Sequence, residues 1–270
     1  QLSGDAISTG THNSFLGQDS GGANNTGAYN VAVGGSALAS NTSANENTAL
    51  GFQSAYTNQT GTAIVAVGTK AGYYTTGDAS TYVGYQAGLN ATSGQNNICI
   101  GHQSGISGSP GGNITSGSNI LALGDENIAN AHIQVDWTVA SDKRDKTDVE
   151  PVKMGLDFVK DLEPVTYRWD KRSKYVDLSD DTVDLDEVVH DGTHKEDWSD
   201  IGFLAQDVEV LEEKYGHKIA DKTNLTTSVT EDGKQYGLQY SKFVPILVKA
   251  IQELSEKNDT LEARIKELEG

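Results

Sequence analysis

The chain has 270 residues, with 20 basic and 38 acidic side chains and a formal net charge of -18. A chain this acidic repels phosphate backbones and anionic lipid, which argues against nucleic acid and membrane surfaces as partners. No apolar run approaches the roughly 20 residues of a membrane span, so we expect no membrane insertion. The chain starts at Gln1 without a signal-peptide pattern, and we expect it to be part of a longer protein.

Composition divides the chain into two predicted domains. Residues 1–140 hold 23 of the 30 glycines, one basic residue and seven acidic ones, whereas residues 141–270 hold 19 basic and 31 acidic residues. We therefore expect a glycine-rich repeat segment over 1–140 and a charged α+β domain over 141–270. Cys99 is the single cysteine, so no intrachain disulfide can form, and its apolar neighbours predict a buried structural thiol.

The first half is a repeat with a countable period. A short apolar run ending in glycine recurs with steps of 17, 17, 17, 16, 17 and 23 residues, at Gly17, Gly34, Gly51, Gly68, Gly84, Gly101 and Gly124. Each unit predicts a strand of three to five residues followed by a turn rich in Gly, Asn, Thr and Ser. Because so short a unit cannot bury a core alone, neighbouring units must stack, and we expect a β-solenoid or β-roll of about 17-residue repeats.

Each unit has only one or two large apolar side chains, which is a thin core for one chain. Three chains around a common axis, each contributing Leu, Val and Ile to a shared interior, would supply the missing core. The units also resemble the Asn-x-Val-Ala-Ile-Gly repeats of trimeric adhesin heads and phage fibres, although the period here is longer. We therefore expect a trimeric, interleaved β-roll or β-prism, whose winding the sequence leaves open.

The turns contain features with two interpretations. Outside the predicted last helix, six Asn-x-Ser/Thr triplets occur, at Asn24, Asn41, Asn58, Asn90, Asn113 and Asn224. Turns enriched in these residues produce such triplets without any glycosylation. Four tyrosines either cap the edges of the units, the interpretation we favour, or form a glycan-binding face: Tyr56, Tyr73, Tyr74 and Tyr85. Sugar hydrolysis is not expected, because it needs a carboxylate pair and the repeat has seven scattered acidic residues.

At the junction of the two halves lies the run Ser141-Asp142-Lys143-Arg144-Asp145-Lys146. A serine hydroxyl becomes a nucleophile when a nearby base takes its proton, and a lysine is such a base if burial or a neighbouring cation lowers its pKa. A Ser-Lys pair is a known variant of the serine nucleophile. The five-residue spacing is weak by itself, and a solvated charged linker is the alternative interpretation.

The second half predicts α+β structure. Pro151 and the apolar spacing that follows predict a helix over 152–162, and strands are expected at 165–169 and 201–203, with a helix over 205–214. Asp232-Gly233 predicts a hairpin turn. The acidic stretch 177–197 contains His190 and His194, but it has neither an EF-hand nor a zinc spacing. We therefore expect a solvated loop there and predict neither a metal nor a cofactor.

The last segment carries a heptad pattern that predicts a coiled-coil helix over 241–269. Apolar residues alternate steps of three and four along a seam, at Val244, Leu247, Ile251, Leu254, Asn258, Leu261, Ile265 and Leu268. Asn258 occupies an a position, where a polar group lowers stability but sets the register. Isoleucine at a with leucine at d suits a dimer as well as a trimer, so this seam alone does not set the number of chains.

Taken in order, four sequence blocks resemble the C-terminal intramolecular chaperone auto-processing domain of phage tail spikes and fibres, a self-cleaving peptidase family named for endosialidases. The blocks, together with the Ser-Asp-x-Arg-x-Lys run, are 155–159, 162–169, 201–208 and 240–254. The resemblance covers 141–270. It implies a homotrimer that templates the folding of a β-rich fibre and then cuts itself, assembled in the host cytoplasm and carried on the virion.

The resemblance also implies roles for the motif residues. Ser141 would attack the carbonyl of Ala140, cutting the Ala140-Ser141 bond, with Lys146 as base and later proton donor. Asp142 and Arg144 would position the pair, since an arginine stays protonated and cannot be a base. Two alternatives remain: a trimerisation tip that is never cut, and a fibre segment that binds a host-surface glycan or receptor.

Overall fold

A computed structural model describes residues 2–177 and 184–270 of the chain. It forms two compact units. The first contains the N-terminal residues up to 130 together with 170–195 and 230–235, and the second contains 131–169, 196–229 and 236–270. The C-terminal half of the sequence thus contributes two insertions to the unit that holds the repeats.

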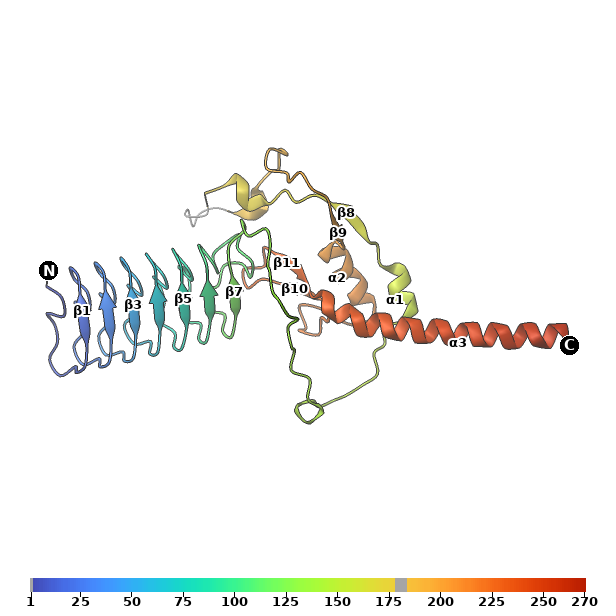
Figure 1. Cartoon of the computed structure of the whole chain (residues 1–270), viewed down its shortest axis with the longest axis horizontal. Coiled ribbons are helices and arrows are strands. Elements are labelled where there is room, and N and C mark those ends of the chain that lie inside the picture. The colour runs from blue at the N-terminus through green and yellow to red at the C-terminus, as the bar shows by residue number, and fades with distance from the viewer. Residues whose placement is uncertain (1, 178–183) are drawn as a thin grey trace. The chain divides into compact units, whose positions relative to one another are not determined.

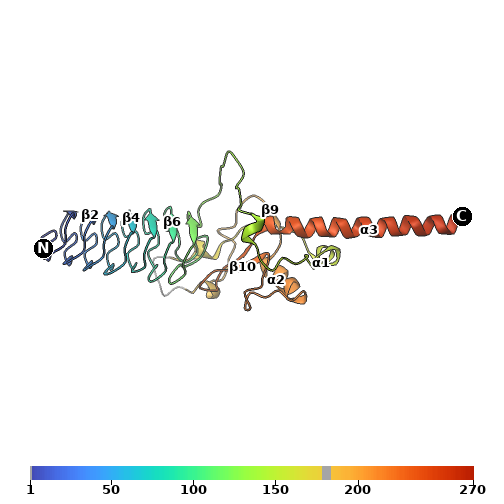
Figure 2. The same cartoon turned by 90° about the horizontal axis from the view of Figure 1, so that it is seen from below.

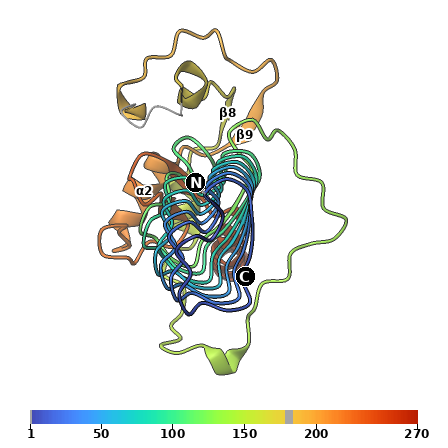
Figure 3. The same cartoon turned by 90° about the vertical axis from the view of Figure 1, so that its left-hand side faces the viewer.

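The repeats form a β-solenoid, as predicted. Its described residues include a seven-stranded parallel sheet in sequential order (Figure 1), with strands β1 (Ser14–Leu16), β2 (Val31–Val33), β3 (Thr48–Leu50), β4 (Val65–Val67), β5 (Thr81–Val83), β6 (Ile98–Ile100) and β7 (Leu121–Leu123). Neighbouring turns pair in register, and seen end-on they superimpose (Figure 3). Each strand pairs with the next strand of the same chain, so the expectation of strands interleaved between chains is wrong: the coil is wound within one chain, as Figure 2 also shows.

The glycine after each strand is required by the backbone. Gly34, Gly51 and Gly68 have φ angles of 128°, 136° and 132°, a region that side chains disfavour. A Cβ on Gly34 would also lie 2.6 Å from the carbonyl oxygen of Gly51 in the next turn. The repeating glycine therefore serves both the turn and the close stacking of turns.

Most strands point a small middle residue inward and the residues on either side of it outward. The middle residue of most strands is fully buried, as at Ala32, Ala49, Ala66, Tyr82 and Cys99. The residues on either side of it face solvent. This row of apolar side chains, called here the sheet face, includes Leu16, Val31, Leu50, Val65, Ile98, Ile100, Leu121 and Leu123. One chain thus fills its own narrow core with alanines and with larger side chains such as Leu38, Ile64 and Tyr82, which corrects the expectation that the repeat lacks an interior.

Buried polar side chains shape the turns. Asn24, Asn41 and Asn58, all in Asn-x-Ser/Thr triplets, are fully buried. The Asn41 amide donates to the side-chain oxygen of Asn24 (3.1 Å), and the Gly61 backbone N–H donates to that of Asn58 (2.9 Å). These three triplets are turn elements, in line with our interpretation. Burial also raises the pKa of the Cys99 thiol to about 11, which confirms it as a buried structural group.

The second unit contains the predicted α+β elements: α1 (Leu156–Asp161), β8 (Val165–Tyr167), β9 (Asp200–Gly202), α2 (Ala205–Lys214), β10 (Thr227–Val229), β11 (Tyr236–Leu238) and α3 (Phe243–Glu269). β8 pairs antiparallel with β9, and β10 with β11 as the predicted hairpin. The prediction that the first helix starts at residue 152 is wrong. It starts at Leu156, whose N–H donates to the Glu253 carboxylate of α3 over 2.7 Å and so caps the helix there.

One cluster forms the core of this unit, made of Met154, Phe158, Val208, Leu211, Phe243 and Ile246. Glu212 on α2 lies fully buried beside it and accepts hydrogen bonds from the backbone N–H (2.6 Å) and hydroxyl (2.7 Å) of Thr226. Burial raises the pKa of Glu212, but hydrogen bonds from Thr227 and Thr226 outweigh that effect and hold it below its usual value. These bonds tie α2 to the start of β10.

The acidic stretch is more ordered than the predicted solvated loop. Residues 178–183 of it lie outside the described residues, but the rest contains the 3-10 helix Leu185–Glu187, and another 3-10 helix, Arg172–Tyr175, comes just before the stretch. Leu185 is only 1% exposed. His190 and His194 both pack against the Tyr175 ring. Packed parts of this stretch therefore belong to the first unit.

Candidate functional site

The Ser-Lys pair lies in the second unit, on the segment before α1. The Lys146 Nζ donates a hydrogen bond of 2.6 Å to the Ser141 Oγ. A short 3-10 helix, Lys143–Asp145, folds the chain back between them and brings the two side chains together. The distance is within the range that a nucleophile and its base require.

Asp142 and Arg144 hold this short helix in shape. The Asp142 carboxylate accepts a bond of 2.9 Å from the Arg144 backbone N–H, as an N-cap, and one of 2.6 Å from the Arg144 Nη2. Hydrogen bonds from Arg144 lower the pKa of Asp142, and the same contact raises the pKa of Arg144. In this geometry the two residues position the turn, and neither contacts the Ser141 hydroxyl.

The pair lies within a long exposed stretch. Every residue from 127 to 153 is exposed in the single chain. Among them Ile133, Val135, Trp137 and Val139, just before the Ala140-Ser141 bond, are between 52% and 77% exposed. They alternate with polar residues, the pattern of a strand with one buried face, yet they form no strand here. This possible strand was not predicted from the sequence, although alternation with period two is the signal that would have indicated it.

The long helix α3 has two different faces. Phe243, Ile246 and Ala250 pack on the domain and are at most 5% exposed. The heptad seam lies elsewhere on the helix: Ile251 is 66% exposed and Leu268 is 80% exposed. The helix continues to Glu269, well beyond its packed residues. The seam is therefore apolar and open to solvent.

The tyrosines singled out in the repeats stack along the solenoid. Tyr56 and Tyr73, from adjacent turns, are stacked with ring centroids 5.0 Å apart, and Tyr85 stacks on His102 at 5.3 Å. Contact between turns agrees with the interpretation that they cap the units. Tyr74 and Tyr85 also keep 45% and 48% of their surface exposed, so glycan binding stays a prediction.

The described residues contain neither a metal-binding cluster nor a membrane-spanning helix. No group of three or more His, Cys, Asp or Glu residues there is arranged to hold a metal ion. No helix in the part of the chain that the structure describes is both long and apolar enough to cross a membrane.

The fold is that of a β-solenoid followed by an α+β domain with a long terminal helix. Residues 141–216 match the family described as chaperone of endosialidase, and the match begins at Ser141. This confirms the family recognised from the sequence for that part of the chain, and it supports an intramolecular chaperone role. No curated protein and no solved structure matches the chain.

Proposed function

We propose that this chain is a homotrimeric intramolecular chaperone with its client attached: the C-terminal domain, 141–270, brings three copies together and templates the fibre segment, 1–140. It then cuts the Ala140-Ser141 bond: Lys146 takes the proton of the Ser141 hydroxyl, the Ser141 oxygen attacks the Ala140 carbonyl, and the Ser141 amine leaves with a proton returned by Lys146. Water hydrolyses the resulting Ala140 ester and so separates the two fragments. The observation that carries the proposal is the exposed heptad seam of α3, since a row of leucine and isoleucine open to water is stabilised by pairing with copies of itself.

Two further apolar surfaces support assembly from identical chains. The sheet face carries exposed apolar side chains on most turns, which suits a homotypic contact along the solenoid. The alternating stretch 133–139 has the pattern of a strand, and it pairs with no strand among the residues that the structure describes. Each of the three surfaces would be covered by another copy. The number of chains in the assembly, three, rests on the family resemblance.

Assembly would also activate cutting. A lysine acts as a base for a hydroxyl when burial or a neighbouring cation disfavours its charged form. Ser141 and Lys146 are in contact but exposed, so the covering has to come from other copies packing over 133–139 and the motif. Cutting would then follow trimer formation, and the product would persist through its unfolding barrier after losing its template.

Mass measurement tests both parts of the proposal. Native mass of the Ser141→Ala chain should be three times that of one chain, and a denaturing gel of the unchanged sequence should show two fragments where Ser141→Ala shows one band. A monomer would overturn the assembly. A trimer that shows a single band in both would instead favour an uncut trimerisation tip.

By the family resemblance we place the assembled protein on the virion, as part of a tail fibre or spike formed in the host cytoplasm. Binding of a host-surface glycan by the exposed tyrosines is the second candidate function, favoured by the open faces of Tyr74 and Tyr85. A glycan array with the trimer tests it, with alanine at both positions as the control.

A further inference from the structure

The turns of the solenoid are joined at one corner by a repeated set of hydrogen bonds. In several turns a carbonyl oxygen accepts two backbone N–H groups and a hydroxyl from the turn before. The Thr92 carbonyl accepts from the Thr76 N–H (2.7 Å), the Gly77 N–H (3.0 Å) and the Thr76 hydroxyl (3.2 Å). The Gln59 carbonyl accepts the same three kinds of donor from Thr42 and Ser43. The donors of these turns are thus satisfied by a carbonyl of the turn that follows.

The last turn has no following turn, and a side chain takes its place. The Glu231 carboxylate accepts backbone N–H groups from Thr115 (3.2 Å), Ser116 (3.0 Å) and Gly117 (2.9 Å). It also accepts the hydroxyls of Thr115 (3.0 Å) and Ser116 (2.6 Å). The Thr115 N–H and hydroxyl and the Ser116 N–H correspond to the donors that bond to a carbonyl in the earlier turns, and the acceptor has changed from a peptide oxygen to a carboxylate.

The glycines at this corner show the same substitution independently. A Cβ on Gly77 would lie 2.1 Å from the carbonyl oxygen of Gly94, and one on Gly94 would lie 2.0 Å from that of Gly117. A Cβ on Gly117 would meet the Glu231 Oε2 at 2.7 Å. The carboxylate oxygen therefore occupies the place along the stack where the next carbonyl oxygen would be.

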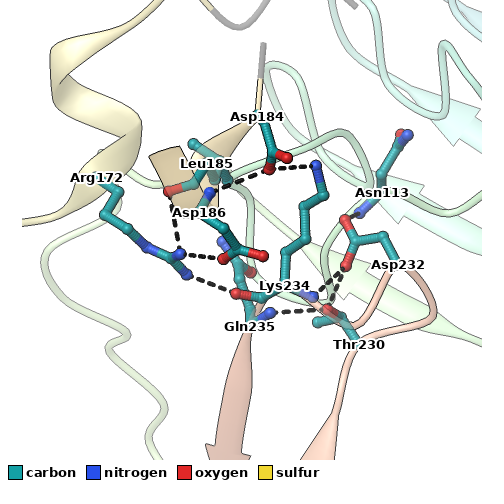
Figure 4. A network of polar contacts seen from close by, with 9 residues as sticks. All are labelled: Asn113, Arg172, Asp184, Leu185, Asp186, Thr230, Asp232, Lys234 and Gln235. Atoms are coloured by element: carbon teal, nitrogen blue, oxygen red, sulfur yellow. Dashed lines mark hydrogen bonds and ion pairs between the residues drawn. The ribbon is translucent and has the colours of Figure 1, made fainter. Parts of the chain in front are cut away.

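The tip that carries Glu231 is the turn between β10 and β11, and a second contact fixes it to the last turn. The Asp232 carboxylate accepts the Asn113 N–H at 3.2 Å and the Lys234 N–H at 3.1 Å, and it also accepts the Thr230 hydroxyl (Figure 4). A Cβ on Gly112 would lie 2.6 Å from the Thr230 Cβ, so the backbone approaches the tip closely.

Segment 170–195 holds the tip from its other side. The Arg172 guanidinium donates to the Lys234 carbonyl (2.5 Å) and to the Asp186 carboxylate (2.6 Å), while the Lys234 Nζ donates to Asp184 at 2.8 Å (Figure 4). Two segments distant in sequence, 170–195 and 230–235, thus converge on the final repeat within one compact unit.

We propose that the hairpin tip 230–235 is the template on which the last solenoid turn closes, with the Glu231 carboxylate standing in for the carbonyl of a further turn. The templating step rests on the proposed chaperone function. The hairpin tip is then the contact through which the C-terminal domain acts. It provides a pre-formed edge that sets the register of turn 113–124. The earlier turns stack on that turn one after another toward the N-terminus.

Amide hydrogen exchange on the full chain tests the contact. In a Ser141→Ala background, which keeps the chain in one piece, Glu231→Ala should speed exchange at 115–117 by at least about tenfold, since bonds to a charged acceptor are lost. The exchange rate at 115–117 in Glu231→Gln, which keeps one acceptor oxygen, should lie between the rates of Glu231→Ala and of the chain with Glu231. Glu213→Gln removes one charge from an exposed position of α2 and should leave 115–117 unchanged.

Pulse labelling during refolding tests the template. Turn 113–124 should gain protection before the turns near residue 30, and Glu231→Gln should delay that gain while Glu213→Gln does not. Protection at 115–117 that is equal in all variants, or protection that starts at the N-terminal turns, would overturn the inference. If Glu231→Ala does not fold, exchange at 115–117 in Glu231→Gln, compared with Glu213→Gln, tests the contact instead. If the chain proves monomeric or uncut and exchange at 115–117 still depends on Glu231, the proposed trimer or cleavage is refuted. The Glu231 contact is supported in either case.

Discussion

The Lys146 Nζ lies 2.6 Å from the Ser141 Oγ, and both residues are exposed in the single chain. Removing the base while keeping the charge separates chemistry from assembly. We expect Lys146→Arg to abolish cutting, since arginine cannot take the serine proton, and to leave the native mass of the trimer unchanged. A denaturing gel over time checks this, with Lys143→Arg as the matched control. Cutting at an undiminished rate in Lys146→Arg would rule out the lysine as base.

The sheet face offers a test of assembly that spares the fold. Leu50 is 48% exposed, so Leu50→Lys should leave the single-chain solenoid intact. Buried between copies, the unpaired charge would cost roughly several kcal/mol per ion and shift the population toward monomer. Sedimentation at several concentrations measures the shift, and Thr60→Lys, on an exposed turn, is the control. Equal trimer populations in both variants would place the interface elsewhere.

The polar residue in the helix seam predicts a trade between stability and specificity. Asn258→Ile should raise the unfolding temperature of the assembled helices and allow more than one oligomer size or register, because the buried amide no longer penalises the alternatives. Native mass together with a thermal melt checks both effects. A higher melting temperature with one unchanged oligomer size would mean that register is set by other contacts.

The backbone angle of Ala63 predicts a stabilising change. This exposed residue has φ 57°, a conformation that costs an L residue about 1 kcal/mol or more. Ala63→Gly should therefore raise the free energy of unfolding of the repeat by about 0.5–1 kcal/mol, which urea denaturation can measure. Ala66→Gly, at a fully buried strand position, should instead lower it. A destabilising effect at residue 63 would show that its methyl group contributes packing.

Glu231 predicts a loss of stability in acid. Partial burial raises its pKa, but hydrogen bonds from the Ser116 hydroxyl and the N–H groups of Gly117, Ser116 and Thr115 outweigh this and bring it from 4.5 to about 2. The contact is therefore fully present above pH 4.5 and is lost as pH falls toward 2. Asp184 and Asp232 also lie near the tip, so the comparison has to be with Glu231→Gln. The difference in urea midpoint between the two chains should shrink between pH 5 and pH 3, and a constant difference would contradict the prediction.

The spacing of glycines predicted each strand of the solenoid, because the period repeats the same backbone requirement at Gly34, Gly51 and Gly68. It did not predict which apolar residues point inward. In a three-residue strand the first and third side chains share a face, and the alanine between them is a weak hydrophobic signal. The large residues were therefore expected inside, whereas the structure buries Ala32 and Ala49 and exposes their neighbours.

Contacts between distant segments were not predicted, because they leave no local pattern in the sequence. The helix expected from residue 152 starts at Leu156 because Glu253, 97 residues later, caps it. The contact of Glu231 with Ser116 joins residues 115 positions apart and has no local pattern. The Ser141–Lys146 pair was accessible from sequence because both residues lie on one short turn. The covering that would make them reactive depends on other chains, which one sequence does not describe.

Since each turn of the solenoid offers the same donors on one edge and the same acceptors on the other, whole turns can be inserted or deleted without altering either end. The Glu231 carboxylate would engage any terminal turn that keeps the Thr-Ser-Gly sequence at its corner. Fibres of different lengths could thus evolve, or be engineered, in steps of about 17 residues while the same C-terminal domain builds them all.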